Sequence, residues 1–180
     1  MDEKKRKQLL QKIEKDLGSK DESVVTSALK QTQKHGDASL ILPLLRAFRD
    51  AKEGKLKDAL SETLSTIKLS DAEEIYMEAL ENKEFASIQE NILSFTWNAG
   101  FQPVDSVDLI TKIAIEGDYM TGVEAMTLLD SMPGPLDEES LMQGLIIIRQ
   151  YLLDHKDEGH PNYDIGISIY DMLSRHERDA

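Results

Sequence analysis

The residues best suited to chemistry are the four histidines, because the chain contains no cysteine. Two of them, His155 and His160, flank Lys156, Asp157 and Glu158 in one short polar segment. Imidazole nitrogens and carboxylate oxygens are suitable ligands for divalent metals. The intervening lysine and the loose hold of a loop on its ligands favour a solvated connector instead. We therefore predict no metal site.

No other constellation of residues predicts catalysis. The chain lacks a Gly-x-Ser-x-Gly elbow, a phosphate-binding loop, a dinucleotide fingerprint and a His-Glu-x-x-His motif. A histidine-dependent hydrolase needs a nucleophile and an orienting acid beside its base. The positions of the histidines predict helix ends and loops: His35, His155, His160 and His176. We expect surface or capping roles for them, no catalytic residues and no cofactor.

Acidic residues gather between Ser70 and Glu90, where seven acids accompany one lysine. Four glutamates of this segment fall in one predicted helix: Glu73, Glu74, Glu78 and Glu81. Such a strip can dock a basic peptide or helix through charge complementarity. The alternative is that they are ordinary solvated glutamates. These four residues are our first candidates for a partner-binding site.

Phe95, Trp97 and Phe101 form the chief concentration of aromatic residues. Residues two positions apart on a helix point in different directions, so Phe95 and Trp97 cannot both face one core. Trp97 is therefore a candidate anchor for a partner, with core packing as the alternative.

The charge balance bears on the class of partner. The chain has 34 acidic and 21 basic residues, a net charge of −13. Residues 1–20 hold seven basic and four acidic residues, and the remaining 160 hold 14 and 30. An acidic body repels phosphate backbones, so we expect no nucleic-acid partner and favour a protein or peptide of basic character.

The first residues lack the apolar stretch of a secretory signal. No run approaches the roughly 18 apolar residues needed to cross a bilayer. We expect no membrane span and a cytoplasmic location.

The elements that must position these residues repeat along the chain. A small apolar ladder recurs at residues 28, 59, 92 and 125, in steps of 31, 33 and 33 residues. This period predicts stacked helical hairpins, here over about 21–51, 54–82, 84–116 and 118–154. A helix over 3–17 and a last helix after a loop around 156–162 would close the ends. Ser70 and Glu73 have the spacing of a capping box.

The first hairpin resembles a HEAT repeat through Val24-Val25, Ala28-Leu29, Gly36-Asp37, Ile41, Leu44-Leu45, Phe48 and Asp50. The resemblance covers about 21–154 and weakens along it, since the second hairpin lacks the turn glycine. An armadillo-like or other α-solenoid is a related alternative. The fold that the resemblance implies is all-α: a right-handed superhelix of about four hairpins. Residues 1–20 would form an N-terminal cap, 21–154 the array, and 155–180 a connector and C-terminal cap.

The same resemblance implies a protein-interaction scaffold and carries no catalytic residues. The second helices of the hairpins would line a concave wall, with Arg46 and Arg49 among its solvent-facing residues. The leading hypothesis is a non-catalytic binding module. An enzyme or enzyme-associated chaperone of lyase type, using the concave groove, is the alternative. Self-association through an open end is a third, and the oligomeric state is not predicted.

Overall fold

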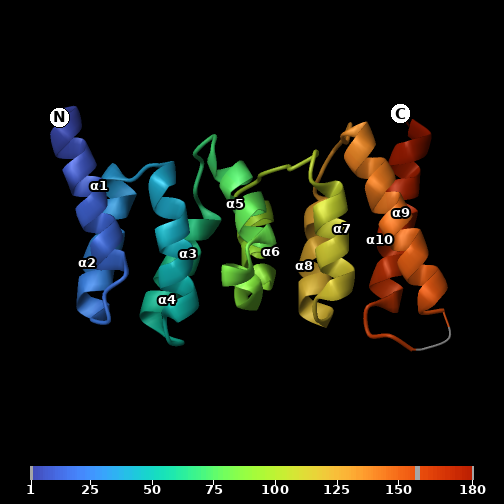
Figure 1. Cartoon of the computed structure of the whole chain (residues 1–180), viewed down its shortest axis with the longest axis horizontal. Coiled ribbons are helices and arrows are strands. Elements are labelled where there is room, and N and C mark those ends of the chain that lie inside the picture. Colours follow the sequence, from blue (N-terminus) through green and yellow to red (C-terminus); the bar gives the residue numbers. More distant parts are fainter. Residues whose placement is uncertain (1, 157–158, 180) are drawn as a thin grey trace. The chain divides into compact units, whose positions relative to one another are not determined.

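The computed structural model describes residues 2–156 and 159–179, with side chains described as far as Glu177. In this part of the chain all regular elements are helices, ten α-helices and two short 3-10 helices (Figure 1). The prediction of an all-α protein is confirmed. None of the described helices combines the length and apolar character that a bilayer crossing requires.

The chain forms two compact units, residues 1–88 and 89–180. The elements of the first unit are α1 (Glu3–Leu17), α2 (Glu22–His35), η1 (Ala38–Leu40), α3 (Ile41–Asp50), α4 (Lys55–Ser65), α5 (Ala72–Glu81) and η2 (Lys83–Ile88). Those of the second unit are α6 (Gln89–Asn98), α7 (Val107–Glu116), α8 (Tyr119–Asp130), α9 (Glu138–Asp154) and α10 (Tyr163–Asp179).

Aspartate side chains begin several of these helices. Asp21 accepts a hydrogen bond from the Ser23 N–H at the start of α2, and Asp137 accepts one from the Ser140 N–H at the start of α9. Each cap satisfies an amide that the first turn leaves without an intrahelical partner. The predicted cap at Ser70 was wrong. The N-cap of α5 is Asp71, and the Ser70 hydroxyl donates to its carboxylate at 2.8 Å.

In the first unit, α1 packs along α2, and α3 packs along α4. Contacts also join one helical pair to the next. α3 contacts both α1 and α5, and α2 contacts α4. The hairpins predicted from the sequence joined α2 to α3 and α4 to α5 instead. That pairing was wrong by one helix, because in the described residues those two pairs have almost no packing contact.

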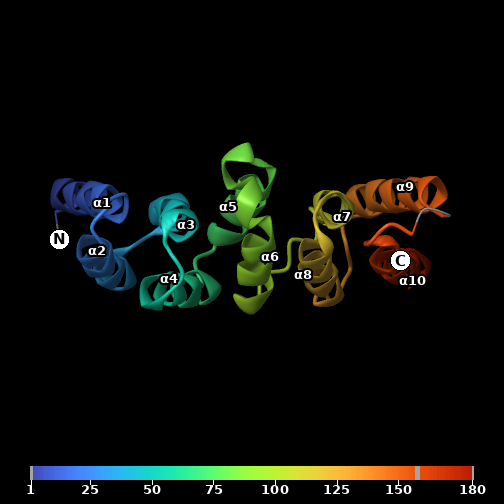
Figure 2. The same ribbon diagram turned by 90° about the horizontal axis from the view of Figure 1, so that it is seen from below.

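The second unit follows the same pairing. α7 packs along α8, and α9 along α10, whereas the predicted hairpins joined α6 to α7 and α8 to α9. Figure 2 shows α7 and α9 in one layer with α8 and α10 in the other, and α6 packs on α8. Within each unit a further contact joins alternate helices, α3 with α5 and α7 with α9.

Each unit buries its own apolar residues. In the first unit the Tyr76 ring is fully buried, and its hydroxyl donates to the Leu64 carbonyl at 2.7 Å. Burial raises the pKa of the Tyr76 hydroxyl, so it stays a neutral donor. In the second unit Ile110, Ala125 and Ile148 are completely buried. α10 buries Ile165, Ile169 and Leu173.

Candidate partner-binding surfaces

The predicted glutamates lie on α5, and three of them share its solvent face. Glu74, Glu78 and Glu81 are exposed, and their spacing of four and three residues places them in one line along the helix. We call these three the acidic strip. Glu73 lies about 100° further round the helix and is half-buried. Glu73 therefore flanks the acidic strip and is not part of it.

The acidic strip carries charge that the fold does not neutralise. Within the described part of the chain, no basic side chain forms an ion pair with Glu74, Glu78 or Glu81. Three like charges on successive turns repel one another and slightly destabilise a helix. A cationic partner would remove that repulsion, so the strip is better suited to a basic ligand than to an apolar one.

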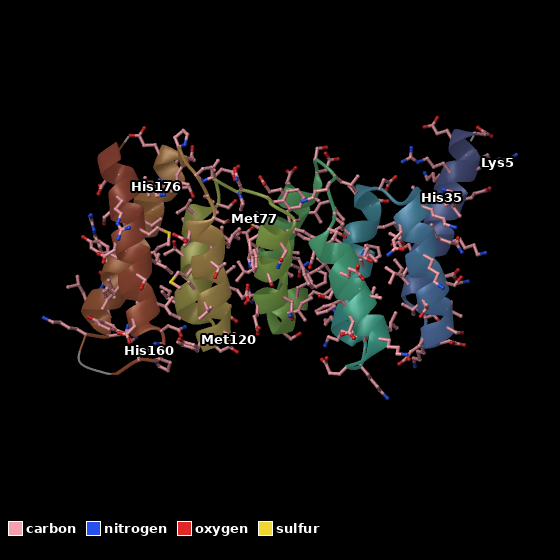
Figure 3. The ribbon with its side chains drawn as sticks, turned by 180° about the vertical axis from the view of Figure 1, so that it is seen from behind. Lys5, His35, Met77, Met120, His160 and His176 are labelled. Carbon is pink, nitrogen blue, oxygen red and sulfur yellow. The ribbon has the colours of Figure 1, made fainter. Side chains whose placement is uncertain are left out.

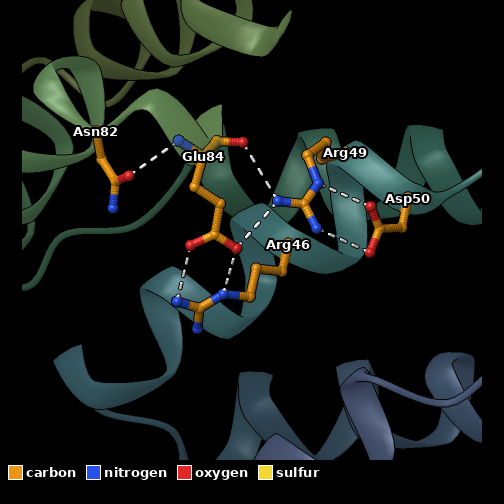
Figure 4. Close-up of polar contacts among 5 residues, drawn as sticks. All are labelled: Arg46, Arg49, Asp50, Asn82 and Glu84. Atoms are coloured by element: carbon orange, nitrogen blue, oxygen red, sulfur yellow. Dashed lines mark hydrogen bonds and ion pairs between the residues drawn. The ribbon is translucent and has the colours of Figure 1, made fainter. Parts of the chain in front are cut away.

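Glu84, in the same acidic segment, has a different role (Figure 4). Its carboxylate accepts two hydrogen bonds from Arg46, at 2.8 and 3.1 Å, and one from Arg49 at 3.0 Å. Arg49 also holds Asp50 through two bonds, and both guanidinium groups lie 6.0 Å from the Phe85 ring centre. Hydrogen bonding from Arg46 lowers the pKa of the Glu84 carboxyl. The Arg46, Arg49 and Glu84 charges are therefore used to attach η2 to α3.

Trp97 belongs to the second unit and is half-buried on α6. Its indole N–H donates to the Glu124 carboxylate of α8 at 2.7 Å, while Phe95 on another face of α6 is buried. The predicted difference between the two rings is confirmed. The polar end of Trp97 is already occupied, so any contact with a partner would use the exposed part of its ring.

The two units differ strongly in charge. Residues 1–88 carry 17 acidic and 16 basic residues, a net charge of −1, whereas residues 89–180 carry 17 and five, a net charge of −12. Almost the whole negative charge of the chain therefore belongs to the second unit. A comparison of residues 1–20 with the remaining 160 residues does not show that the excess of acidic residues lies in the second unit.

The second unit has a groove of about 550 Å³ where the C-terminal ends of α7 and α9 meet. Its lining is largely apolar, from Ile115, Ile146, Ile147 and Tyr151. Glu116 and Asp154 supply carboxylates, and His155 and His160 supply imidazoles. Sequence analysis found the histidines and missed the isoleucines, whose placement depends on how α7 and α9 pack.

The two histidines of this groove have defined hydrogen bonds. The Nδ1 of His160 lies 2.6 Å from the Tyr151 hydroxyl and accepts the Asn162 N–H at 3.3 Å. Because an amide can only donate, this nitrogen is unprotonated and Tyr151 donates to it. The Nδ1 of His155 lies 2.9 Å from the Tyr151 carbonyl, which can only accept, so His155 donates there. His155 thus caps α9, as predicted for a histidine at a helix end.

The remaining predictions concern the polar segment around His155 and the last histidine, His176. In the described residues no group of three or more His, Asp or Glu side chains is placed to hold a metal ion. Asp157 and Glu158 of the polar segment lie outside the described residues. His176 lies in the last turn of α10, which agrees with its predicted place at a helix end. Figure 3 shows His160 and His176 towards opposite ends of that helix.

Comparison with protein-family models, curated proteins and solved structures finds no match to this chain.

Proposed function

We propose that this protein is a non-catalytic interaction module of α-solenoid type that binds a basic protein or peptide. The observation that carries the proposal is the acidic strip on α5. Glu74, Glu78 and Glu81 form one exposed row and have no ion-pair partner in the described residues. A lysine- or arginine-rich segment lying along α5 would neutralise them in turn.

The packing of each unit supports the solenoid part of the proposal. Each unit contains helical pairs, α1 with α2, α3 with α4, α7 with α8 and α9 with α10, and neighbouring pairs pack on one another. Arrays of this kind offer long helix faces to partners, because a core is buried by stacking without covering the outer face of each helix. The resemblance of residues 21–51 to a HEAT repeat is a second support.

Charge reversal tests the proposal. Glu74→Lys with Glu78→Lys should abolish salt-sensitive capture of partner proteins from the native cell extract, because two of the three charges of the strip change sign. The measurement is quantitative mass spectrometry of captured proteins at low and moderate salt, since screening weakens contacts between exposed charges.

The matched control is Asp58→Lys with Glu62→Lys. These residues are also exposed, also four positions apart, and lie on α4 of the same unit. Both double variants change the net charge equally. Loss of the same proteins from both variants would indicate a nonspecific charge effect and contradict the role of α5. Unchanged capture by the α5 variant would remove the acidic strip from the proposal.

A further inference from the structure

The helix α9 carries apolar residues on two of its faces. One face is buried against its neighbours and includes Leu141, Leu145 and Ile148. A second face exposes Met142, Ile146 and Leu153, whose exposed fractions are 42%, 54% and 73%. Their spacing of four and seven residues places them on one stripe. Single exposed apolar residues are ordinary on a surface, whereas a stripe of three along one helix is typical of a binding surface.

This stripe borders the groove between α7 and α9. Ile146 belongs to both, and Ile115 and Ile147 continue the apolar surface into the groove. A groove between two helices accepts the apolar side of a third helix, with anchor residues at spacings of three, four and seven. The volume of about 550 Å³ is enough for a few large side chains.

The electrostatics of the groove identify the charge of its occupant. Glu116 and Asp154 line it, each as the last residue of its helix. The C-terminal ends of α7 and α9 add partial negative charge, and neither helix has a basic residue in its last turn. α7 and α9 contain one basic residue each, Lys112 and Arg149, and neither lines the groove. Arg149 contacts Glu177 at 3.7 Å and lies over the Tyr170 ring, both on α10.

We propose that the α7–α9 groove docks an amphipathic helix of a partner protein, with large apolar residues on one face and lysines or arginines beside them. A second copy of the chain fits less well. Two such grooves facing each other would bring together units of net charge −12. The basic α1 of a second copy already packs its apolar residues Ile13 and Leu17 against its own unit. The α7–α9 groove and the acidic strip consist of different residues, so different variants test the two proposals and either can fail alone.

Defined peptides and the full chain test this inference. We expect a fluorescein-labelled amphipathic peptide of Leu, Lys and Ala to bind the wild type, with salt-sensitive affinity measured by fluorescence anisotropy. The same peptide with Glu in place of Lys, or with Gln in place of Leu, should bind at least about tenfold more weakly. Ile146→Ser should weaken binding of the Leu/Lys peptide by about five- to tenfold, because Ile146 supplies apolar area to the contact.

Matched variants make the outcome specific. Ile167→Ser removes an isoleucine of similar exposure, 40%, from α10 outside the groove and should leave affinity unchanged. Glu116→Gln with Asp154→Asn should weaken binding, whereas Glu138→Gln with Glu139→Gln at the other end of α9 should not. The proposal would be overturned if the wild type bound the Lys and Glu peptides equally well, or bound neither. It would also be overturned if Ile146→Ser and Ile167→Ser changed the affinity equally. A self-associated chain that Ile146→Ser dissociates would overturn it too, since a second copy would then occupy the groove.

Discussion

Asn162 joins the segment before α10 to the end of α7 through its side-chain amide. The residue is 1% exposed, and its Nδ2 donates to the carbonyls of Ala114 at 3.0 Å and Gly117 at 2.9 Å. A longer contact of 3.4 Å reaches the Asp118 carbonyl. These carbonyls lie where α7 ends and α8 begins, and helix ends leave such groups without intrahelical partners. One amide therefore satisfies acceptors that are 44 to 48 residues distant in sequence.

We predict that Asn162→Ala lowers the free energy of unfolding by about 2–3 kcal/mol, because buried carbonyls would lose their donor. Asn162→Asp keeps the shape and replaces the donor with a carboxylate, so it should destabilise at least as much at neutral pH. Urea denaturation followed by circular dichroism measures both changes. Asn98→Ala is the control, since the Asn98 amide also donates to a carbonyl but is exposed, and about 0.5 kcal/mol or less is expected. If Asn98→Ala and Asn162→Ala lowered the free energy of unfolding equally, the proposed role of the Asn162 amide would be contradicted.

Single residues with local partners were predictable from sequence, and those with distant partners were not. Asp21 and Asp137 bond to amides two and three residues ahead, so their capping role follows from neighbouring residue types. Asn162, in contrast, follows a polar loop and has no local pattern that indicates its partners on α7. The hydrogen bonds from Arg46 and Arg49 to Glu84 could not be predicted either, because they join residues that are 38 and 35 positions apart. The two arginines were expected to face solvent.

At the level of elements, glycines inside helices mark where two helices cross closely. A Cβ on Gly122 of α8 would lie 3.0 Å from the Ile165 side chain and 3.1 Å from the Ala114 carbonyl oxygen. A Cβ on Gly144 of α9 would meet only side-chain atoms, of Leu173, Thr111 and Val107, each at 3.3 Å. The residue types alone do not distinguish these two positions, whereas the surroundings of each Cβ position do.

We predict opposite consequences for the two glycine-to-alanine changes. Both gain about 1 kcal/mol of helix propensity. At Gly122 this gain is outweighed because a backbone oxygen of α7 cannot move away cheaply, so Gly122→Ala should destabilise by about 1–2 kcal/mol net. Gly144→Ala should stay within about 1 kcal/mol of wild type, because its close contacts are all at 3.3 Å and include no backbone atom, so a small adjustment relieves them. Urea denaturation of the two single variants measures both changes in the free energy of unfolding. A larger loss of stability for Gly144→Ala than for Gly122→Ala would contradict the prediction.

The helices themselves were predictable, but their pairing was not. Apolar residues repeat with the helical period, and caps and breakers mark the ends, so the positions of most helices follow from the sequence. Pairing depends on which face meets which neighbour. A helix such as α9, which is apolar on more than one face, is compatible with both neighbours in the chain. The HEAT resemblance selected α8 as the partner of α9, whereas the structure pairs α9 with α10.

At the level of the whole molecule, charge is distributed very unequally between the two units. Residues 89–180 hold a net charge of −12 within one compact unit, and residues 1–88 hold −1. Repulsion among like charges opposes compaction, and salt screens it over roughly 10 Å at 0.1 M ionic strength. The two units should therefore differ in how their stability responds to salt, whatever the size of their apolar cores.

We predict that sodium chloride increases the protection of backbone amides in α7, α9 and α10 more than in α1–α4. Hydrogen exchange measured by mass spectrometry resolves these helices within one intact chain, so both units experience the same conditions. The direction follows from self-repulsion, since screening removes an unfavourable term that is large in the acidic unit and small in the nearly neutral one. Ion pairs in the first unit, such as Arg46 with Glu84, should weaken slightly with salt and enlarge the contrast. An equal gain in both units would mean that general salting-out of apolar surface dominates. In that case the acidity of the second unit would have no measurable effect on its stability, and its clearest remaining consequence would be the choice of a basic partner.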